Sequence, residues 1–208
     1  MKNLRVKPVF IVTLFFCAGA LILEAWYYSF PNVRLFDLDG EYNIPSLFEA
    51  LLFGFAGLAA LANCRRRSTY FWQWLFIGTA LIFAGLDEFF CFHERVTSLA
   101  SQAQHGAKLH NVWMLGYVPV LYGAIIFLKG MWREIKAVQA RSAWLMVLAL
   151  FCWFCSFPPE LLVQWGILPE RFWRFEIGFE ELLEMSGSIL LFYAFLSVPR
   201  SLSHRQPR

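Results

Sequence analysis

Eight carboxylates lie in the interior of the hydrophobic segments of this chain, each in the half of its segment nearest one side of a membrane. A charged side chain near a bilayer centre costs about 2.5–3.5 kcal/mol on the scale from insertion experiments. Carboxylates therefore persist there when they are protonated, hydrated, paired or bound to a cation. The eight residues are Glu24, Glu49, Asp87, Glu88, Glu160, Glu180, Glu181 and Glu184.

Carboxylates from several helices, together with imidazole, are the ligand set of metal centres built in helical bundles. The sequence therefore predicts a metal site, with iron, manganese or zinc as the cofactor. The predicted ligands are Glu49, Asp87, Glu88, His93, Glu94, Glu160, Glu180, Glu181 and Glu184. The alternative is that some of these carboxyl groups are protonated and hydrogen bonded, and serve only helix packing.

Helix geometry leaves two arrangements open for the segment from Leu86 to Glu94. At 100° per residue Asp87 and Glu94 share one stripe, whereas Glu88 and His93 are about 140° apart. Either the site uses the Asp87 and Glu94 face, or the helix ends near Phe92 and the chain turns His93 back.

The last hydrophobic segment carries a compact acidic patch, because Glu180, Glu181 and Glu184 lie within about 100° of one another on a helix. We expect one carboxylate from each of four segments to approach a common cavity. These four residues are Glu49, Asp87, Glu160 and Glu184.

The elements that would position these residues are membrane-spanning helices. The chain is 59% hydrophobic and 16% charged, which is typical of a multi-span membrane protein and leaves no room for a soluble domain. Windows of about 20 apolar residues predict an all-α, integral membrane bundle of six transmembrane helices that forms a single domain over residues 1–208. The six spans are 9–29, 44–63, 71–91, 112–130, 143–165 and 176–197.

Basic residues predict the orientation, since Lys and Arg are retained on the cytoplasmic side. Thirteen of the 18 Lys and Arg residues, and one of the 15 acidic residues (Glu134), lie on the side that holds both termini. The N- and C-termini are therefore predicted to be cytoplasmic. The basic residues flank the predicted spans, where they are expected to interact with anionic lipid headgroups. They give no indication of nucleic-acid binding.

Local signals refine the second and fifth spans, and the first span could instead be a signal peptide. Asn43 and Pro45 are predicted to open the second span, and Pro158-Pro159 to kink or unwind the fifth just before Glu160. The basic start and the Ala18-Gly19-Ala20 triplet also fit a cleaved signal peptide, but the apolar run continues to an aromatic edge at residues 26–28, as expected of a retained span.

Three stretches carry a family resemblance: Asp37 to Pro45, LDEFFCFHE from Leu86 to Glu94, and EELLEMSG from Glu180 to Gly187. With them the chain resembles an uncharacterised family of small bacterial multi-span membrane proteins. The resemblance implies that the acidic residues of the last two stretches and His93 belong together. It also implies a bacterial inner membrane, with the acidic side facing the periplasm. Similarity to seven-span ceramidase-type hydrolases is weaker, because their late His-x-x-x-His is missing.

Three functions remain open at this point. The first is a metal-dependent membrane enzyme that acts on a lipophilic substrate from the periplasmic half of the bundle. The second is a non-catalytic subunit or assembly factor that meets a membrane-protein partner. The third is a proton or cation transporter, which the absence of acidic residues from the inner halves of the spans disfavours. The sequence by itself does not decide whether the protein is an enzyme.

Overall fold

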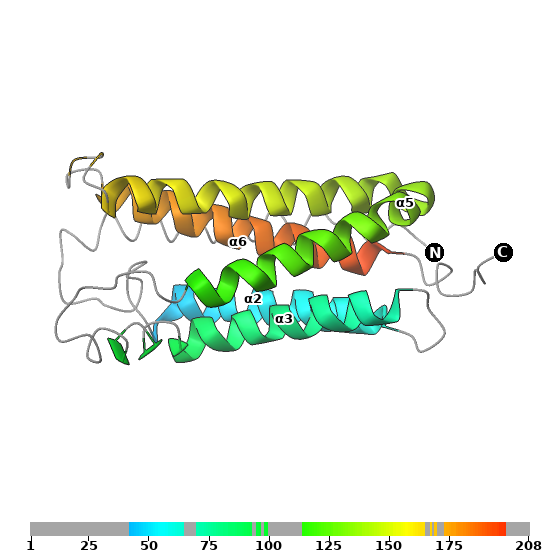
Figure 1. Ribbon diagram of the computed structural model, residues 1–208, viewed down its shortest axis with the longest axis horizontal. Helices are drawn as coiled ribbons and strands as arrows, with labels where there is room; N and C mark the ends of the chain where they lie inside the picture. The colour runs from blue at the N-terminus through cyan, green and yellow to red at the C-terminus, as the bar shows by residue number, and fades with distance from the viewer. Residues whose placement is uncertain are drawn as a thin grey trace.

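The computed structural model describes residues 42–64, 70–92, 95–96, 98–99, 114–164, 167, 169 and 173–198. Within this part the chain is all-α, as predicted, and its long helices lie alongside one another (Figure 1). Helix α2 pairs with α3, and α5 pairs with α6, while α2 also contacts α6. The helices are α2 (Ile44–Ala62), α3 (Phe71–Phe90), α5 (Met114–Gln164) and α6 (Trp173–Ser197).

Helix α2 begins where the sequence predicts, at a capping box. The Asn43 side chain accepts from the Ser46 N–H at 3.0 Å, and the Asn43 N–H donates to Ser46 Oγ at 3.1 Å. Pro45 follows in the first turn, where its missing N–H has no intrahelical role. This start fixes the position of Glu49, which lies just over one turn into the helix.

Helices α2 and α3 run antiparallel and touch through glycines. A Cβ atom on Gly57 would lie 2.7 Å from the Gly78 carbonyl oxygen, and one on Gly85 would lie 2.7 Å from the Ala50 carbonyl oxygen. Both neighbours are backbone atoms, so neither contact tolerates a side chain without moving a helix. Small residues at such positions are what allow membrane helices to approach closely.

We predict that Gly85→Ala destabilises the protein by about 1–3 kcal/mol, the usual effect of overpacking a tight contact. The control is Gly54→Ala on the facing helix, because a Cβ there meets nothing within 4 Å. The control should be neutral or slightly stabilising, since alanine favours helix. Thermal unfolding in detergent, followed by circular dichroism, measures both. Equal effects of the two variants would show that the α2–α3 contact is not tight at Gly85.

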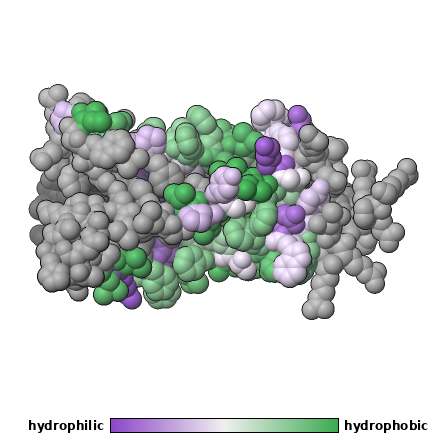
Figure 2. All heavy atoms as spheres, in the orientation of Figure 1, coloured by the Kyte–Doolittle hydropathy of each residue, from purple (hydrophilic) through white to green (hydrophobic). Residues whose placement is uncertain are grey.

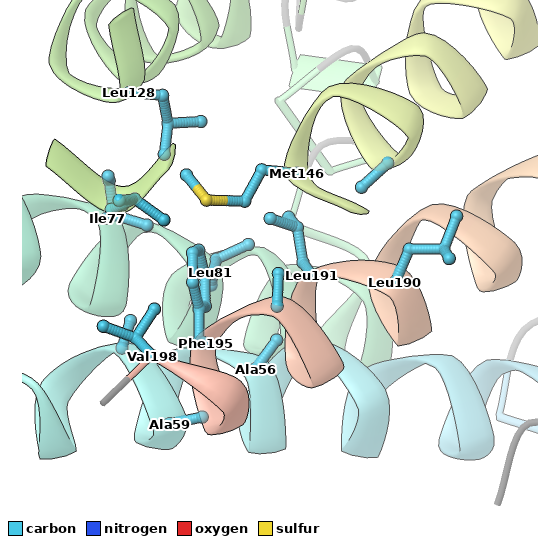
Figure 3. Packing of buried hydrophobic residues seen from close by; sticks show 14 of the residues in the cluster. Ala56, Ala59, Ile77, Leu81, Leu128, Met146, Leu190, Leu191, Phe195 and Val198 are labelled. Atoms are coloured by element: carbon cyan, nitrogen blue, oxygen red, sulfur yellow. The ribbon is translucent and has the colours of Figure 1, made fainter. Parts of the chain in front are cut away.

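The hydrophobic core lies between the four helices. Figure 3 shows Ile77, Leu81, Met146, Leu191 and Phe195 meeting between α3, α5 and α6. Toward the ends of α2 and α6, the Asn63 side-chain amide donates to the Phe195 carbonyl oxygen at 2.9 Å. Because Asn63 and Phe195 both lie near the C-terminal ends of their helices, α2 and α6 run in the same direction.

Three described helical stretches are long and apolar enough to cross a membrane: Ile44–Ala62, Phe71–Phe90 and Gln139–Ser156. They indicate a membrane protein that contacts the lipid bilayer. Exposed leucines and phenylalanines on α2, at positions 47, 51, 55 and 58, agree with this, and Figure 2 shows apolar side chains gathered over the middle of the visible surface. The arrangement of six spans, their orientation and the single-domain boundary stay predictions, and residues 9–29 lie outside the described part.

Helix α5 joins the predicted fourth and fifth spans. Its non-helical residue is Gln139 (φ −151°, ψ 84°), within the polar stretch that separates two apolar runs. Helical structure continues through Pro158-Pro159 to Gln164, so the helix does not unwind at the proline pair, and a kink there stays a prediction. Neighbouring helices make such prolines tolerable in membrane bundles. Where the fourth span is predicted, the structure has a shorter apolar helical stretch, Val118–Trp132.

Helix α6 covers the predicted sixth span but is not among the three long apolar stretches. Four glutamates lie in its first half, at positions 176, 180, 181 and 184. Its uninterrupted apolar part therefore begins at Met185 and is shorter than a full membrane crossing. The N-terminal half of α6 thus depends on the bundle, and not on lipid, to accommodate its charges.

Candidate functional site

Glu49 is the centre of an acidic cluster inside the bundle. Its side chain is 1% exposed. It interacts electrostatically with Glu181, Glu88 and Glu184, and its carboxyl group hydrogen bonds that of Glu181. The other carboxyl oxygen, Oε1, has no hydrogen-bond partner. We call Glu49, Glu88, Glu181 and Glu184 the carboxylate cluster.

Three helices bring this cluster together. The close contact of Gly85 with Ala50 sets the rotation of α3 against α2, and Glu88 follows Gly85 by three residues, about 60° around the helix. Glu88 therefore lies beside the α2 face that carries Glu49. Glu181 and Glu184 reach Glu49 from α6, which packs against α2.

Helix α5 fixes the position of Glu184. Ser156 Oγ lies 3.1 Å from Glu184 Oε1, and the Trp153 indole N–H donates to the Glu184 carbonyl oxygen at 3.1 Å. A Cβ atom on Gly187 would lie 2.6 Å from Trp153 Nε1. Any side chain at position 187 would displace the indole from Glu184, so this position needs glycine. This is a physical reason for the glycine that ends the Glu180 to Gly187 segment.

The cluster needs positive charge. A hydrogen bond between two carboxyl groups requires a proton, since two ionised carboxylates offer no donor. The sequences of α2, of α3 and of α6 from Glu176 onward contain no Lys, Arg or His. Four carboxylates without a cation would repel one another strongly inside the bundle. Compensation must therefore come from protons, water, other parts of the chain or a bound cation.

The described residues contain no ready-made metal centre. No group of three or more His, Cys, Asp or Glu side chains among them has a geometry that could hold a metal ion. The predicted ligands His93 and Glu94 lie outside the described part, as does the side chain of Glu160, whose backbone belongs to α5. Metal binding therefore stays a prediction.

The remaining predicted ligands of the described part, Asp87 and Glu180, lie on α3 and α6. Asp87 is buried, with 4% of its surface exposed, and lies about 160° around α3 from Gly85, while Glu88 of the same helix interacts electrostatically with Glu49. Helix α3 ends at Phe90, and Cys91 is left-handed (φ 53°), with its N–H donating to the Asp87 carbonyl oxygen. The helix thus ends close to Phe92, as in the second arrangement, while the position of His93 lies outside the described part. Glu180 is half-buried on α6.

Three residues near the cluster were not predicted. Glu176 is 5% exposed and hydrogen bonds Glu180, and its Oε1 has no partner. The spacing of four residues between Glu176, Glu180 and Glu184 was the signal that could have identified it. Ser156 and Trp153 carried no such signal, because their roles depend on how α5 packs against α6.

Comparison with known proteins gives a family. No curated protein and no solved structure matches the chain. Residues 6–198 match the family described as a domain of unknown function, DUF8692. The match covers most of a chain whose described part is helical with three candidate membrane spans. This membrane protein therefore belongs to the DUF8692 family.

Proposed function

We propose that the protein holds a divalent cation in the carboxylate cluster. The observation that carries the proposal is the buried Glu49 side chain, which faces three other carboxyl groups and keeps one oxygen without a partner. A buried acceptor without a partner costs free energy, and a buried charge costs more unless it is compensated. A divalent cation would compensate several carboxylates at once.

The donor set supports a cation that prefers oxygen ligands. Carboxylates suit manganese, whereas iron and zinc are also bound by mixed carboxylate and imidazole sets. In the proposed site Glu49, Glu181 and Glu184 are the core ligands, and Glu88 approaches from α3. The predicted ligands Glu160 and His93 would complete the coordination. The cation would draw the carboxylates closer than they lie without it, since like charges otherwise keep them apart.

We assign to this site a metal-dependent reaction on a lipophilic substrate in the outer half of the membrane. The cluster lies among apolar helices whose exposed side chains meet lipid, so lipid-soluble molecules reach it more readily than ions do. The bound cation would supply Lewis acidity. The chain itself supplies carboxylates, which can accept or donate a proton. The inner halves of α2, α3 and α6 carry no acidic residue, which argues against a continuous ion pathway.

Metal analysis tests the proposal. The protein is purified in detergent without chelator, and bound manganese, iron and zinc are measured by mass spectrometry. We expect about one metal ion per chain in the wild type and its loss in Glu49→Gln, which keeps the size of the side chain but removes its charge.

The matched control is Glu134→Gln. It removes a carboxylate from the N-terminal half of α5, whereas the residues of α5 that contact Glu184 lie in its C-terminal half. Its metal content should equal that of the wild type. A wild-type protein that stays metal-free after incubation with excess Mn²⁺, Fe²⁺ and Zn²⁺ would overturn the proposal.

A further inference from the structure

A short helical stretch follows α3 at the end of the bundle that holds the carboxylate cluster. Cys91 turns the chain out of α3 in the left-handed conformation (φ 53°). The Arg95 N–H then donates to the Cys91 carbonyl oxygen at 3.2 Å, which is the four-residue spacing of an α-helix. We call the described helical residues beyond Cys91 the exit stretch: Phe92, Arg95, Val96, Ser98 and Leu99.

The exit stretch has one apolar side, and that side is exposed. Phe92, Val96 and Leu99 follow one another at intervals of four and three residues, which is the spacing of one helical face. Their exposed fractions are 38%, 49% and 65%. Phe90, the last residue of α3, is also exposed, and its ring stacks on that of Phe92 with centroids 5.6 Å apart. An exposed apolar face that continues a candidate membrane span is typical of a segment that lies in the membrane interface.

Arg95 lies at the edge of this apolar face, and Tyr42 positions its side chain. On a helix Arg95 is about 60° from Phe92 and about 40° from Leu99. Its guanidinium donates to the Tyr42 hydroxyl at 3.3 Å, and the Tyr42 ring meets that of Phe89 edge-on. A guanidinium has five N–H donors, and the hydrogen bond to Tyr42 uses one of them. Both Arg95 and Tyr42 are exposed, so the guanidinium is accessible to a ligand.

We infer that the exit stretch binds a membrane phospholipid, with the lipid phosphate on the Arg95 guanidinium and the acyl chains along Phe90 and Phe92. Arginine binds phosphate through two parallel hydrogen bonds, because its donors form a planar fork. The positive charge selects an anionic group, and the exposed apolar face beside it selects a molecule that also carries acyl chains. A free phosphate ester would use only the first of these two features.

The position of the site names the class of lipophilic substrate, and this step rests on the proposed function. Tyr42 directly precedes Asn43, the residue that caps α2. Glu49 lies five residues after the start of α2, about 8 Å along the helix axis, and Glu88 lies two residues before the end of α3, about 3 Å along its axis. A phospholipid held by Arg95 therefore has its headgroup at the end of the bundle where the carboxylate cluster lies.

Native mass spectrometry of the purified protein in detergent tests the inference, because it counts bound lipids and gives their dissociation constants. A chelator is present, so that the result does not depend on metal. Dioleoylphosphatidylglycerol is the phospholipid probe, dioleoylglycerol is the matched lipid without phosphate, and glycerol 3-phosphate is the matched phosphate without acyl chains.

The variants are Arg95→Gln and Arg95→Lys, and the control is Arg141→Gln. Arg141 is also an exposed arginine, but it lies on α5 about 22 Å along the helix axis from Ser156, the residue that contacts Glu184. Because Arg95 is exposed, its replacement by glutamine leaves the packing of the bundle in place.

We expect the wild type to bind one phosphatidylglycerol about tenfold or more tightly than dioleoylglycerol, and more tightly than glycerol 3-phosphate. Arg95→Gln should weaken the binding of phosphatidylglycerol about tenfold, the lower end of the effect of hydrogen bonds to a charged group. Arg95→Lys should restore only part of the affinity, since lysine keeps the charge but lacks the planar fork. Arg141→Gln should match the wild type.

An affinity for phosphatidylglycerol that is unchanged in Arg95→Gln would overturn the inference. Equal losses in Arg95→Gln and Arg141→Gln would also overturn it, because they would show attraction to surface charge in general. Equally tight binding of glycerol 3-phosphate would show an anion site that does not recognise a membrane lipid, and would overturn it as well.

These results are separate from the metal analysis. A protein that binds the phospholipid through Arg95 but binds no manganese keeps the lipid site and contradicts the proposed function. A protein that binds manganese, with no effect of Arg95→Gln on phospholipid binding, keeps the cation site and contradicts the inference.

Discussion

Replacing Glu49 by leucine is expected to lower the free energy of unfolding of the metal-free protein by about 1–3 kcal/mol, the usual cost of leaving a buried polar partner unsatisfied. The reason is that Glu181 loses the carboxyl group to which it is hydrogen bonded. Glu49→Gln should be close to the wild type in stability, because the amide can still donate to the Glu181 carboxylate. Thermal or denaturant unfolding in detergent, with chelator present, measures both variants.

The same pair of variants separates stability from cation binding. When excess Mn²⁺ is added, only the wild type should gain stability, since a ligand that binds the folded state alone stabilises it. Glu49→Gln folds but lacks the charge, so its unfolding temperature should not respond. If leucine and glutamine destabilise the metal-free protein equally, the hydrogen bond to Glu181 is not what Glu49 contributes.

The second large effect is expected at Gly187, where an alanine should destabilise the protein by about 1–3 kcal/mol through overpacking. Its Cβ would meet Trp153 Nε1 at 2.6 Å and the Ala149 carbonyl oxygen at 3.1 Å. The indole must then leave the Glu184 carbonyl oxygen to which it donates. The shift also moves Glu184 relative to Glu49, so manganese binding should weaken in parallel.

A double-mutant cycle with Trp153→Phe checks this explanation. Phenylalanine lacks the indole nitrogen, so Gly187→Ala should cost less in the Trp153→Phe background than in the wild type. Gly130→Ala is the control on α5, because a Cβ there meets nothing within 4 Å; it should be neutral or slightly stabilising. Strict additivity of Gly187→Ala and Trp153→Phe would contradict the proposed contact.

The helices themselves were largely predictable, because hydropathy and capping are local properties of the sequence. The predicted spans 44–63 and 71–91 agree closely with α2 and α3, which end at Ala62 and Phe90. The signal from Asn43 and Pro45 gave the start of α2 correctly. The proline pair left kinking and unwinding open, because whether a helix unwinds at proline depends on the neighbours that satisfy its free carbonyls, and those are not local.

The cluster was predictable only in part. The glutamates of α6 stood out by their spacing, but the choice between Asp87 and Glu88 depends on how α3 is rotated against α2. That rotation is set by Gly78 and Gly85, whose spacing of seven residues marks the face of α3 that touches α2. Had this glycine stripe been used, Glu88 would have been the expected neighbour of Glu49. The support from α5 could not be predicted, since Ser156 and Trp153 reach Glu184 through tertiary packing alone.

The central claim, that carboxylates from α2 and α6 bind one cation beside Glu88 of α3, is tested most directly by a crystal structure of the protein grown with MnCl₂. An anomalous difference map collected above the manganese absorption edge locates the metal independently of the protein coordinates. We predict a peak between Glu49, Glu181 and Glu184, with at least three carboxylate oxygens at metal-ligand distance. A map without a peak there, with Glu49 and Glu181 still hydrogen bonded, would contradict the account.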